Sequence, residues 1–145
     1  MSNAKQVLRS AKSILLVDWA SPAVPRSLVQ AGFTVFCASP GRYSVVELVS
    51  ESPNGIDSND IIQPKENEKG YLVFRRLTEV PSHVDIVNVF RPENEHEGIF
   101  AKHVVPLGAK VLWLQPSIGS ETARRLSLEH GLDLVEGVDI SNAAR

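Results

Sequence analysis

Residues 14–40 read ILLVDWASPAVPRSLVQAGFTVFCASP, and this stretch decides the predicted fold. Residues 13–17 (SILLV) form a continuous apolar run, as expected for a parallel strand that is covered on both faces. Ser21 and Pro22 predict the start of a helix, because serine accepts hydrogen bonds from free backbone N–H groups and proline is tolerated in the first turn. A second apolar run, residues 33–38 (FTVFCA), follows this helix. The stretch therefore predicts a strand, a helix and a second parallel strand.

The same alternation continues toward the end of the chain. Apolar runs predict further strands, and amphipathic segments predict the helices between them. In the last helix, Ala123, Leu126 and Leu128 are expected to make apolar contacts. Strands that alternate with helices at this spacing predict an α/β protein with a doubly wound, mostly parallel sheet. The predicted strands are residues 71–77, 83–91, 109–115 and 132–137, and the predicted helices are residues 92–107 and 120–130.

The middle of the chain departs from this alternation. Residues 43–51 (YSVVELVSE) predict about two helical turns. Residues 52–70 are rich in Pro, Gly, Asn and charged side chains, a composition that is typical of a surface loop. We therefore predict a surface excursion at about residues 44–69, within a single domain that spans residues 1–145.

Composition and charge limit the classes of partner and the cellular location that we expect for this protein. The chain is 43% apolar and 22% charged with a formal net charge of −2, so no excess of positive charge favours nucleic acid or an acidic membrane surface. No apolar run reaches the roughly 18 residues of a membrane-spanning helix, and no signal-peptide core follows the N-terminal basic residues. The single cysteine, Cys37, excludes an internal disulfide. We expect a cytoplasmic protein without nucleic-acid or membrane partners, and homo-oligomerisation stays open.

The predicted sheet indicates where a ligand would bind. In open α/β sheets, ligands bind beyond the carboxyl ends of the strands, where the strand order reverses. Some of the segments expected there lead into helix N-termini, whose N–H groups and dipole favour an anion. Ser21 is accordingly a candidate for a phosphate contact, and it is equally consistent with a plain helix cap. The segments are residues 18–22, 38–42, 90–93 and 115–119.

Several stretches resemble a known family. They are VDIVNVFRP (residues 84–92), GAKVLWLQPSI (108–118) and ARRLSLEHGLDLVEG (123–137), with a looser match in SPAVPRSLVQAGFTVFCASP (21–40). Together they resemble the small stand-alone CoA-binding proteins, whose domain is similar to the CoA-binding part of the succinyl-CoA synthetase α subunit. The resemblance implies a Rossmann-like, three-layer α/β/α domain that holds the adenine nucleotide part of CoA.

The resemblance also implies the residues of the site. In the family, a serine opens the first helix, an Asn-Pro pair follows the second strand, and an arginine follows the phenylalanine of "FR". A later Trp-x-Gln-x-Gly-Ile motif leads into a helix that faces the ligand. Carried onto this sequence, these features imply a nucleotide site made of Ser21, Ser39, Pro40, Arg91, Gln115 and Ile118, with CoA as the cofactor.

The sequence departs from the family where the phosphates would bind. The family's first glycine falls on Asp18, and the glycine before Ile118 is replaced by Ser117. The loop from Asp18 to Ser21 is also shorter, by roughly five residues, than a turn that cradles phosphate. Two like charges about 4 Å apart repel by about 1–4 kcal/mol at a protein surface. The resemblance therefore predicts CoA binding that is weakened by Asp18.

Other side chains allow more than one interpretation. Arginine side chains near the expected site either supply positive charge or are simply solvated. Each tryptophan either stacks on an adenine or fills space, and Trp113 is expected in the core because it lies within a strand. The four histidines show no metal-ligand spacing. The side chains concerned are Arg42, Arg75, Arg91, Trp19, Trp113, His83, His96, His103 and His130.

Three functions remain open at this stage. The first is a CoA-binding or nucleotide-binding module without catalysis of its own. The second is a protein-interaction or structural domain that has kept the fold and lost the pocket, as the missing glycine and the 44–69 excursion would allow. The third is an enzyme, which depends only on Asp18 lying in a cleft, since no nucleophile elbow or catalytic triad order is present.

Overall fold

The computed structural model describes residues 3–39 and 42–145. Its strands are β1 (Ser13–Val17), β2 (Thr34–Ser39), β3 (Arg42–Val49), β4 (Ile61–Ile62), β5 (Tyr71–Arg76), β6 (Ile86–Val89), β7 (Val111–Leu114) and β8 (Asp133–Val135). Its α-helices are α1 (Ala4–Ser10), α2 (Ala23–Gln30), α3 (His96–Ile99), α4 (Glu121–Glu129) and α5 (Ile140–Ala143). Two 3-10 turns, η1 (Ser58–Asp60) and η2 (Glu93–Glu95), and a π-helical turn, η3 (Phe100–Val104), complete the described elements.

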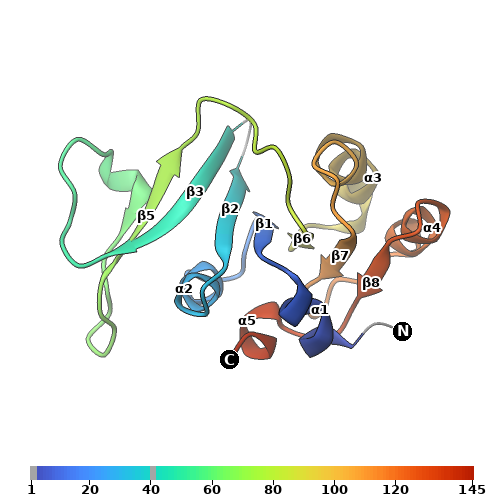
Figure 1. Cartoon of the computed structure of the whole chain (residues 1–145), viewed down its shortest axis with the longest axis horizontal. Coiled ribbons are helices and arrows are strands. Elements are labelled where there is room, and N and C mark those ends of the chain that lie inside the picture. The colour runs from blue at the N-terminus through green and yellow to red at the C-terminus, as the bar shows by residue number, and fades with distance from the viewer. Residues whose placement is uncertain (1–2, 40–41) are drawn as a thin grey trace.

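All the strands join one sheet, in the order β4-β5-β3-β2-β1-β6-β7-β8 (Figure 1). Strands β2, β1, β6, β7 and β8 pair in parallel, whereas β3, β5 and β4 are antiparallel to their neighbours. Helices α1, α2 and α5 lie on one face of the sheet, and α3 and α4 lie on the other. The predicted mostly parallel, three-layer α/β/α architecture is confirmed.

The central strand β1 shows why the apolar run at residues 13–17 forms a buried parallel strand. It pairs with β2 on one side and β6 on the other, and Ile14, Leu15 and Leu16 are fully buried. Leu16 packs toward the α1–α2–α5 layer and Leu15 packs toward the α3–α4 layer, as the alternation of side chains along a strand requires. Both faces of the sheet at β1 are therefore shielded from solvent. None of the described helices is long and apolar enough to cross a membrane.

Two predictions from hydrophobic pattern were wrong. Residues 43–51 do not form helical turns, because residues 42–49 are β3, which pairs with both β2 and β5. The run of β-branched valines at 45, 46 and 49 favours a strand, and the long-range pairing decides the matter. Leu128 does not make an apolar contact, since 84% of its surface is exposed, while Ala123 of the same helix is buried.

The predicted helix at residues 92–107 is present but changes its winding along its length. It begins as the 3-10 turn η2, continues as the short helix α3 and then widens into the π-helical turn η3. Ile99, Phe100 and Val104 face the core, as the apolar residues at spacings of four and five along a helix should. π-Helical turns are rare and are found mainly at functional sites. This turn therefore draws attention to the side chains that it carries.

Arg26 of α2 anchors the end of the excursion to the body of the protein. Its side chain is buried, and its Nη1 donates hydrogen bonds to the carbonyl oxygens of Lys69 (3.2 Å) and Gly70 (3.1 Å). Its Nε lies 3.5 Å from a carboxylate oxygen of Glu68. A buried charge with these partners is costly to remove, because the carbonyls and the carboxylate lose their donor.

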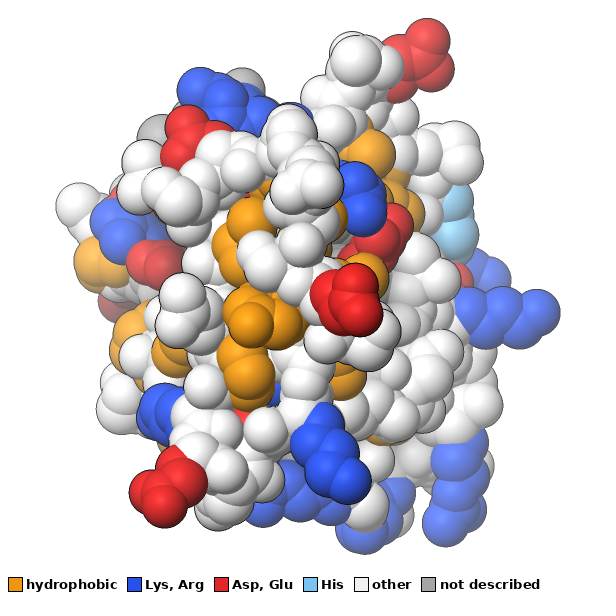
Figure 2. All heavy atoms as spheres, turned by 90° about the vertical axis from the view of Figure 1, so that its left-hand side faces the viewer, with side chains coloured by type: hydrophobic (Ala, Val, Ile, Leu, Met, Phe, Trp, Pro, Cys, Tyr) orange, Lys and Arg blue, Asp and Glu red, His pale blue; other side chains and the backbone are white. Residues whose placement is uncertain are grey.

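Strand β4 only partly covers the outer edge of β5. It contains 2 residues, which pair with Leu72 and Val73. Figure 2 looks onto this end of the molecule and shows hydrophobic side chains reaching the surface in its centre, with charged side chains around them. Leu48 and Ile62, which pack only partly against the core, belong to the strands at this end.

Replacing Arg26 with methionine tests the anchoring role. The variant keeps an apolar stem but leaves two carbonyls and one carboxylate without their donor, so its free energy of unfolding should fall by about 2 kcal/mol. Limited proteolysis should also cut residues 52–68 faster. Arg125→Met is the control, because Arg125 is exposed and forms only exposed ion pairs. Equal stability of the two variants would contradict the anchoring role.

Candidate functional site

The site lies where the strand order reverses, at the carboxyl ends of β1 and β6. These strands are neighbours, but the chain leaves β1 toward α2 on one face and leaves β6 toward α3 on the other. The diverging loops leave a cavity of about 680 Å³, a size that suits a small-molecule ligand. The cavity is lined by Val17, Asp18, Trp19, Ala38, Arg42, Tyr43, Arg91, Asn94, Glu95, Gly98, Ile99, Lys102 and His103.

Asp18 makes the turn that leaves β1. Its φ of 66° lies in the left-handed region, where residues with a Cβ atom are strained. Aspartate is one of the non-glycine residues that adopt this region more readily. Among the described residues, Ser117, with φ 73°, is the only other non-glycine residue with positive φ. These are the two positions at which the family resemblance expects glycine. The chain therefore keeps the backbone geometry of glycine turns while placing side chains on them.

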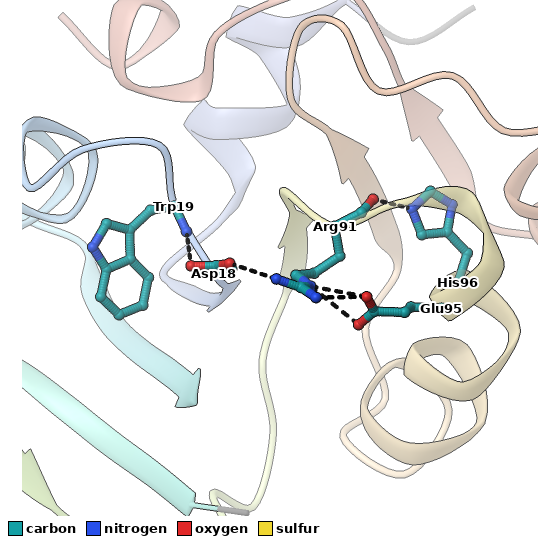
Figure 3. Close-up of polar contacts among 5 residues, drawn as sticks. All are labelled: Asp18, Trp19, Arg91, Glu95 and His96. Carbon is teal, nitrogen blue, oxygen red and sulfur yellow. Dashed lines mark hydrogen bonds and ion pairs between the residues drawn. The ribbon is translucent and has the colours of Figure 1, made fainter. Parts of the chain in front are cut away.

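Arg91 is held between two carboxylates at the floor of the site (Figure 3). Its Nη1 donates to Oδ2 of Asp18 at 3.1 Å, and its Nη2 donates to Oε2 of Glu95 at 2.6 Å. Its Nε also donates to Oε1 of Glu95 at 3.0 Å. The remaining oxygen of Asp18, Oδ1, accepts from the backbone N–H of Trp19 at 2.9 Å. One guanidinium thus neutralises only one of the two acids, and the group keeps an excess negative charge.

The charges in this group stabilise one another. The hydrogen bonds that Arg91 donates to Glu95, and then to Asp18, raise the pKa of Arg91 further above its ordinary value. In return, the hydrogen bond from Arg91 holds the pKa of Glu95 below its ordinary value. Buried His96 completes the arrangement from behind, because its Nε2 donates to the carbonyl oxygen of Arg91 at 2.7 Å. The loop after β6 is therefore held in place through both the side chain and the backbone carbonyl of Arg91.

Trp19 lies beside the cavity and does not fill it. Its ring stacks on Phe74 of β5, with ring centres 5.4 Å apart and an angle of 7° between the planes. In Figure 3 its indole extends away from Asp18 on the side remote from Arg91. Trp113, in contrast, is fully buried in β7 and donates from Nε1 to the carbonyl oxygen of Val138 at 2.8 Å. The prediction that Trp113 belongs to the core is confirmed.

A tyrosine–histidine pair forms another part of the wall. The hydroxyl of Tyr43, near the start of β3, lies 2.6 Å from Nδ1 of His103 in η3, and the two rings meet edge to face. Burial raises the pKa of Tyr43. Burial, with a smaller contribution from the charge of Lys102, lowers the pKa of His103. Both side chains are therefore neutral near pH 7.

The structure brings only part of the predicted site together. Arg91 lines the cavity, and the backbone of Ser39 ends β2 beside it. Ser21 is exposed and outside the cavity wall, where its Oγ accepts a hydrogen bond from the N–H of Ala23 at 3.3 Å, in the turn that leads into α2. Pro40 lies outside the described residues.

Gln115 and Ile118 also lie away from the cavity wall. Gln115 is buried, and its Oε1 accepts from Nδ2 of Asn88 at 3.2 Å and from the N–H of Ile140 at 3.0 Å. These bonds attach α5 to the end of β7. Ile118 packs against the core beside α4. Arg75 pairs with Glu47 at 2.6 Å on the surface of the β3–β5 pair.

Several cavity residues were missed by sequence reasoning. Tyr43 was assigned to a helical segment, and no role was expected for Asn94, Glu95 or Lys102 within the predicted helix at residues 92–107. The one available signal was the position of His103, four residues after Ile99 and three after Phe100, which places it near the apolar side of that helix. In the described part of the chain, no three His, Cys, Asp or Glu side chains are grouped closely enough to hold a metal ion.

Comparison with known proteins places the chain in a family. The family described as "CoA binding domain" matches residues 61–138, which is more than half of the sequence. This chain belongs to the CoA binding domain family. The match contains Arg91, the α3–η3 segment and Ser117, and it does not extend to Asp18.

Solved structures confirm the fold over nearly the whole chain. A protein from Thermus thermophilus is 21% identical with a TM-score of 0.61, and the alignment covers 98% of this chain and 96% of that one. A hypothetical protein from Pyrococcus horikoshii OT3 is 16% identical with a TM-score of 0.59, covering 97% and 86%. A conserved hypothetical protein from Pyrococcus furiosus is 24% identical with a TM-score of 0.51, covering 91% and 97%.

The strained turn at Ser117 makes a testable prediction. Because its φ is positive and its side chain is exposed, Ser117→Gly should raise the free energy of unfolding by about 1 kcal/mol. Chemical denaturation measures the difference. Ser58→Gly serves as the control, since Ser58 is exposed but has no positive φ, and it should give no gain. A loss of stability in both variants would show that the turn is not strained.

Proposed function

We propose that this protein binds CoA or a closely related adenine nucleotide in the cavity at the carboxyl ends of β1 and β6. The observation that supports this most is the position of the cavity. It opens at the reversal of strand order, which is where open α/β sheets bind nucleotides, in a chain of the CoA binding domain family. The proposed setting is the cytoplasm, which suits a single cysteine that is buried and unpaired.

We further propose that this binding is weaker than in a relative with glycine at position 18. The carboxylate of Asp18 stands at the turn where the phosphates would approach, and Arg91 cannot neutralise it fully because Glu95 takes two of its nitrogens. A phosphate entering here would meet the excess negative charge of the group. It would also have to compete with Asp18 and Glu95 for the guanidinium.

The proposed role is binding without catalysis. Asp18 and Glu95 are both engaged by Arg91, so neither carboxylate is placed as an unengaged general base. The only thiol, Cys37, is buried in β2, and burial raises its pKa, which disfavours the nucleophilic thiolate. These features support a module that holds a nucleotide and leaves chemistry to other proteins.

A second candidate, self-association, is favoured by the hydrophobic surface at the β3–β5 end of the sheet. Within the described residues, β4 pairs with only part of β5, and hydrophobic side chains reach the surface there (Figure 2). Exposed strand edges with apolar surroundings promote pairing between chains. Size-exclusion chromatography of the intact chain and of a variant lacking residues 52–68 tests this candidate. A monomer at high concentration in both cases would rule it out.

Adding CoA and replacing Asp18 together test the proposed binding. Millimolar CoA should raise the melting temperature of the wild-type protein, because a ligand that binds only the folded state stabilises it. Asp18→Gly removes the charge and suits the positive φ, and calorimetric titration should show about tenfold tighter CoA binding.

Asp18→Asn separates the two causes. Asparagine removes the charge but keeps a side chain of similar size in the turn, and it tolerates the left-handed region. If charge weakens binding, both variants gain affinity, whereas a gain in Asp18→Gly alone would identify the side chain's bulk as the cause. Absence of any thermal shift with CoA in all three proteins would remove the proposed function.

A further inference from the structure

The charged side chains are distributed unevenly around the cavity. On the side of the β1 turn, Asp18 and Glu95 share Arg91 and leave an excess negative charge. On the side of β3 and η3, the cavity is lined by the exposed cations Arg42 and Lys102. Among the described residues, neither of these two forms an ion pair with a carboxylate. The cavity wall therefore carries two unpaired positive charges, contributed by β3 and η3, in addition to the acidic group at the β1 turn.

The Tyr43–His103 contact holds the two cations in the same part of the wall. Arg42 precedes Tyr43 in β3, and Lys102 precedes His103 in the π-helical turn. The bond of 2.6 Å between the tyrosine hydroxyl and Nδ1 joins these segments, which lie 60 residues apart in the sequence. Tyr43 also packs against the apolar cluster that contains Ile99 and Val104 of the α3–η3 segment.

The same pair also offers a hydrogen bond to a ligand. A neutral tyrosine and a neutral histidine carry one O–H and one N–H proton between them, and their mutual bond uses one of these. Whichever group donates, one donor of the pair is left over, and neither side chain has another partner in the described structure. Two cations and one neutral donor line the same region, which suits an anion such as phosphate.

We propose that Lys102, Arg42 and the Tyr43–His103 pair form the subsite for the phosphate groups of the ligand, displaced from the β1 turn to the wall of β3 and η3. This inference rests on the proposed function and names where its anionic part binds. The turn at Asp18 then faces another part of the ligand, and its charge weakens binding by repelling the phosphate groups across the cavity. A displaced subsite would let the cavity bind an anionic ligand even though its β1 turn carries a carboxylate.

The test measures CoA binding by calorimetric titration to the wild-type protein and to variants of Lys102. Lys102→Gln should weaken binding at least about tenfold, and Lys102→Arg should restore it to within about threefold of the wild type, because arginine keeps the charge. Tyr43→Phe, which removes only the hydroxyl, should also weaken binding. Lys110→Gln is the matched control, since Lys110 is exposed and lies outside this cavity, and it should bind like the wild type.

The outcomes separate the inference from the proposed function. Wild-type binding with equal affinities for Lys102→Gln and Lys110→Gln would overturn the displaced subsite and leave nucleotide binding standing. No binding by the wild type would overturn both. Because Lys102 and Lys110 are exposed, both variants should keep the wild-type melting temperature, so that a loss of CoA affinity reports on the subsite and not on folding.

Discussion

The bridge from Asp18 through Arg91 to Glu95 is the contact on which the site depends. Asp18 directly follows the central strand, Arg91 follows the neighbouring strand, and Glu95 ends η2 directly before α3. A planar guanidinium that donates to carboxylates on both sides fixes the two diverging loops relative to each other. Because the strand order reverses between β1 and β6, this bridge spans the crevice between the loops that leave these two strands. The same bridge decides which charges a ligand meets there.

Two turns of the protein have a backbone conformation typical of glycine but carry other residues. Asp18 and Ser117 both hold left-handed conformations that glycine adopts without strain, at the two positions where the family resemblance expects glycine. A turn of this kind is imposed by the strand and helix that it joins, so replacing the residue changes the chemistry of the loop before it changes the path of the chain. The fold remains that of the CoA binding domain family, while the turn after β1 carries a carboxylate.

The antiparallel pair β2–β3 contributes polar side chains to the wall of the cavity. Strand β3 begins at the carboxyl end of β2, so its first residues lie at the edge of the sheet that carries the cavity. This placement brings Tyr43 to His103 and adds Arg42 to the wall. The π-helical turn contributes Lys102 and His103 from the other direction. Residues 42 and 43, directly before the segment predicted as a surface excursion, thereby belong to the site, and the first residues of that segment continue β3 in the sheet.

The sequence by itself determined the alternation of strands and helices, the buried central strand and the position of Asp18 and Arg91 just beyond the carboxyl ends of strands, because these follow from local periodicity and from the limits of the apolar runs. It did not determine that residues 42–49 form a strand or that Gln115 serves α5, because both depend on partners far along the chain. The pairing of Asp18 with Arg91 and of Tyr43 with His103 was likewise decided only by tertiary structure. Contacts across 73 and 60 residues arise from strand order, and no local pattern encodes that order.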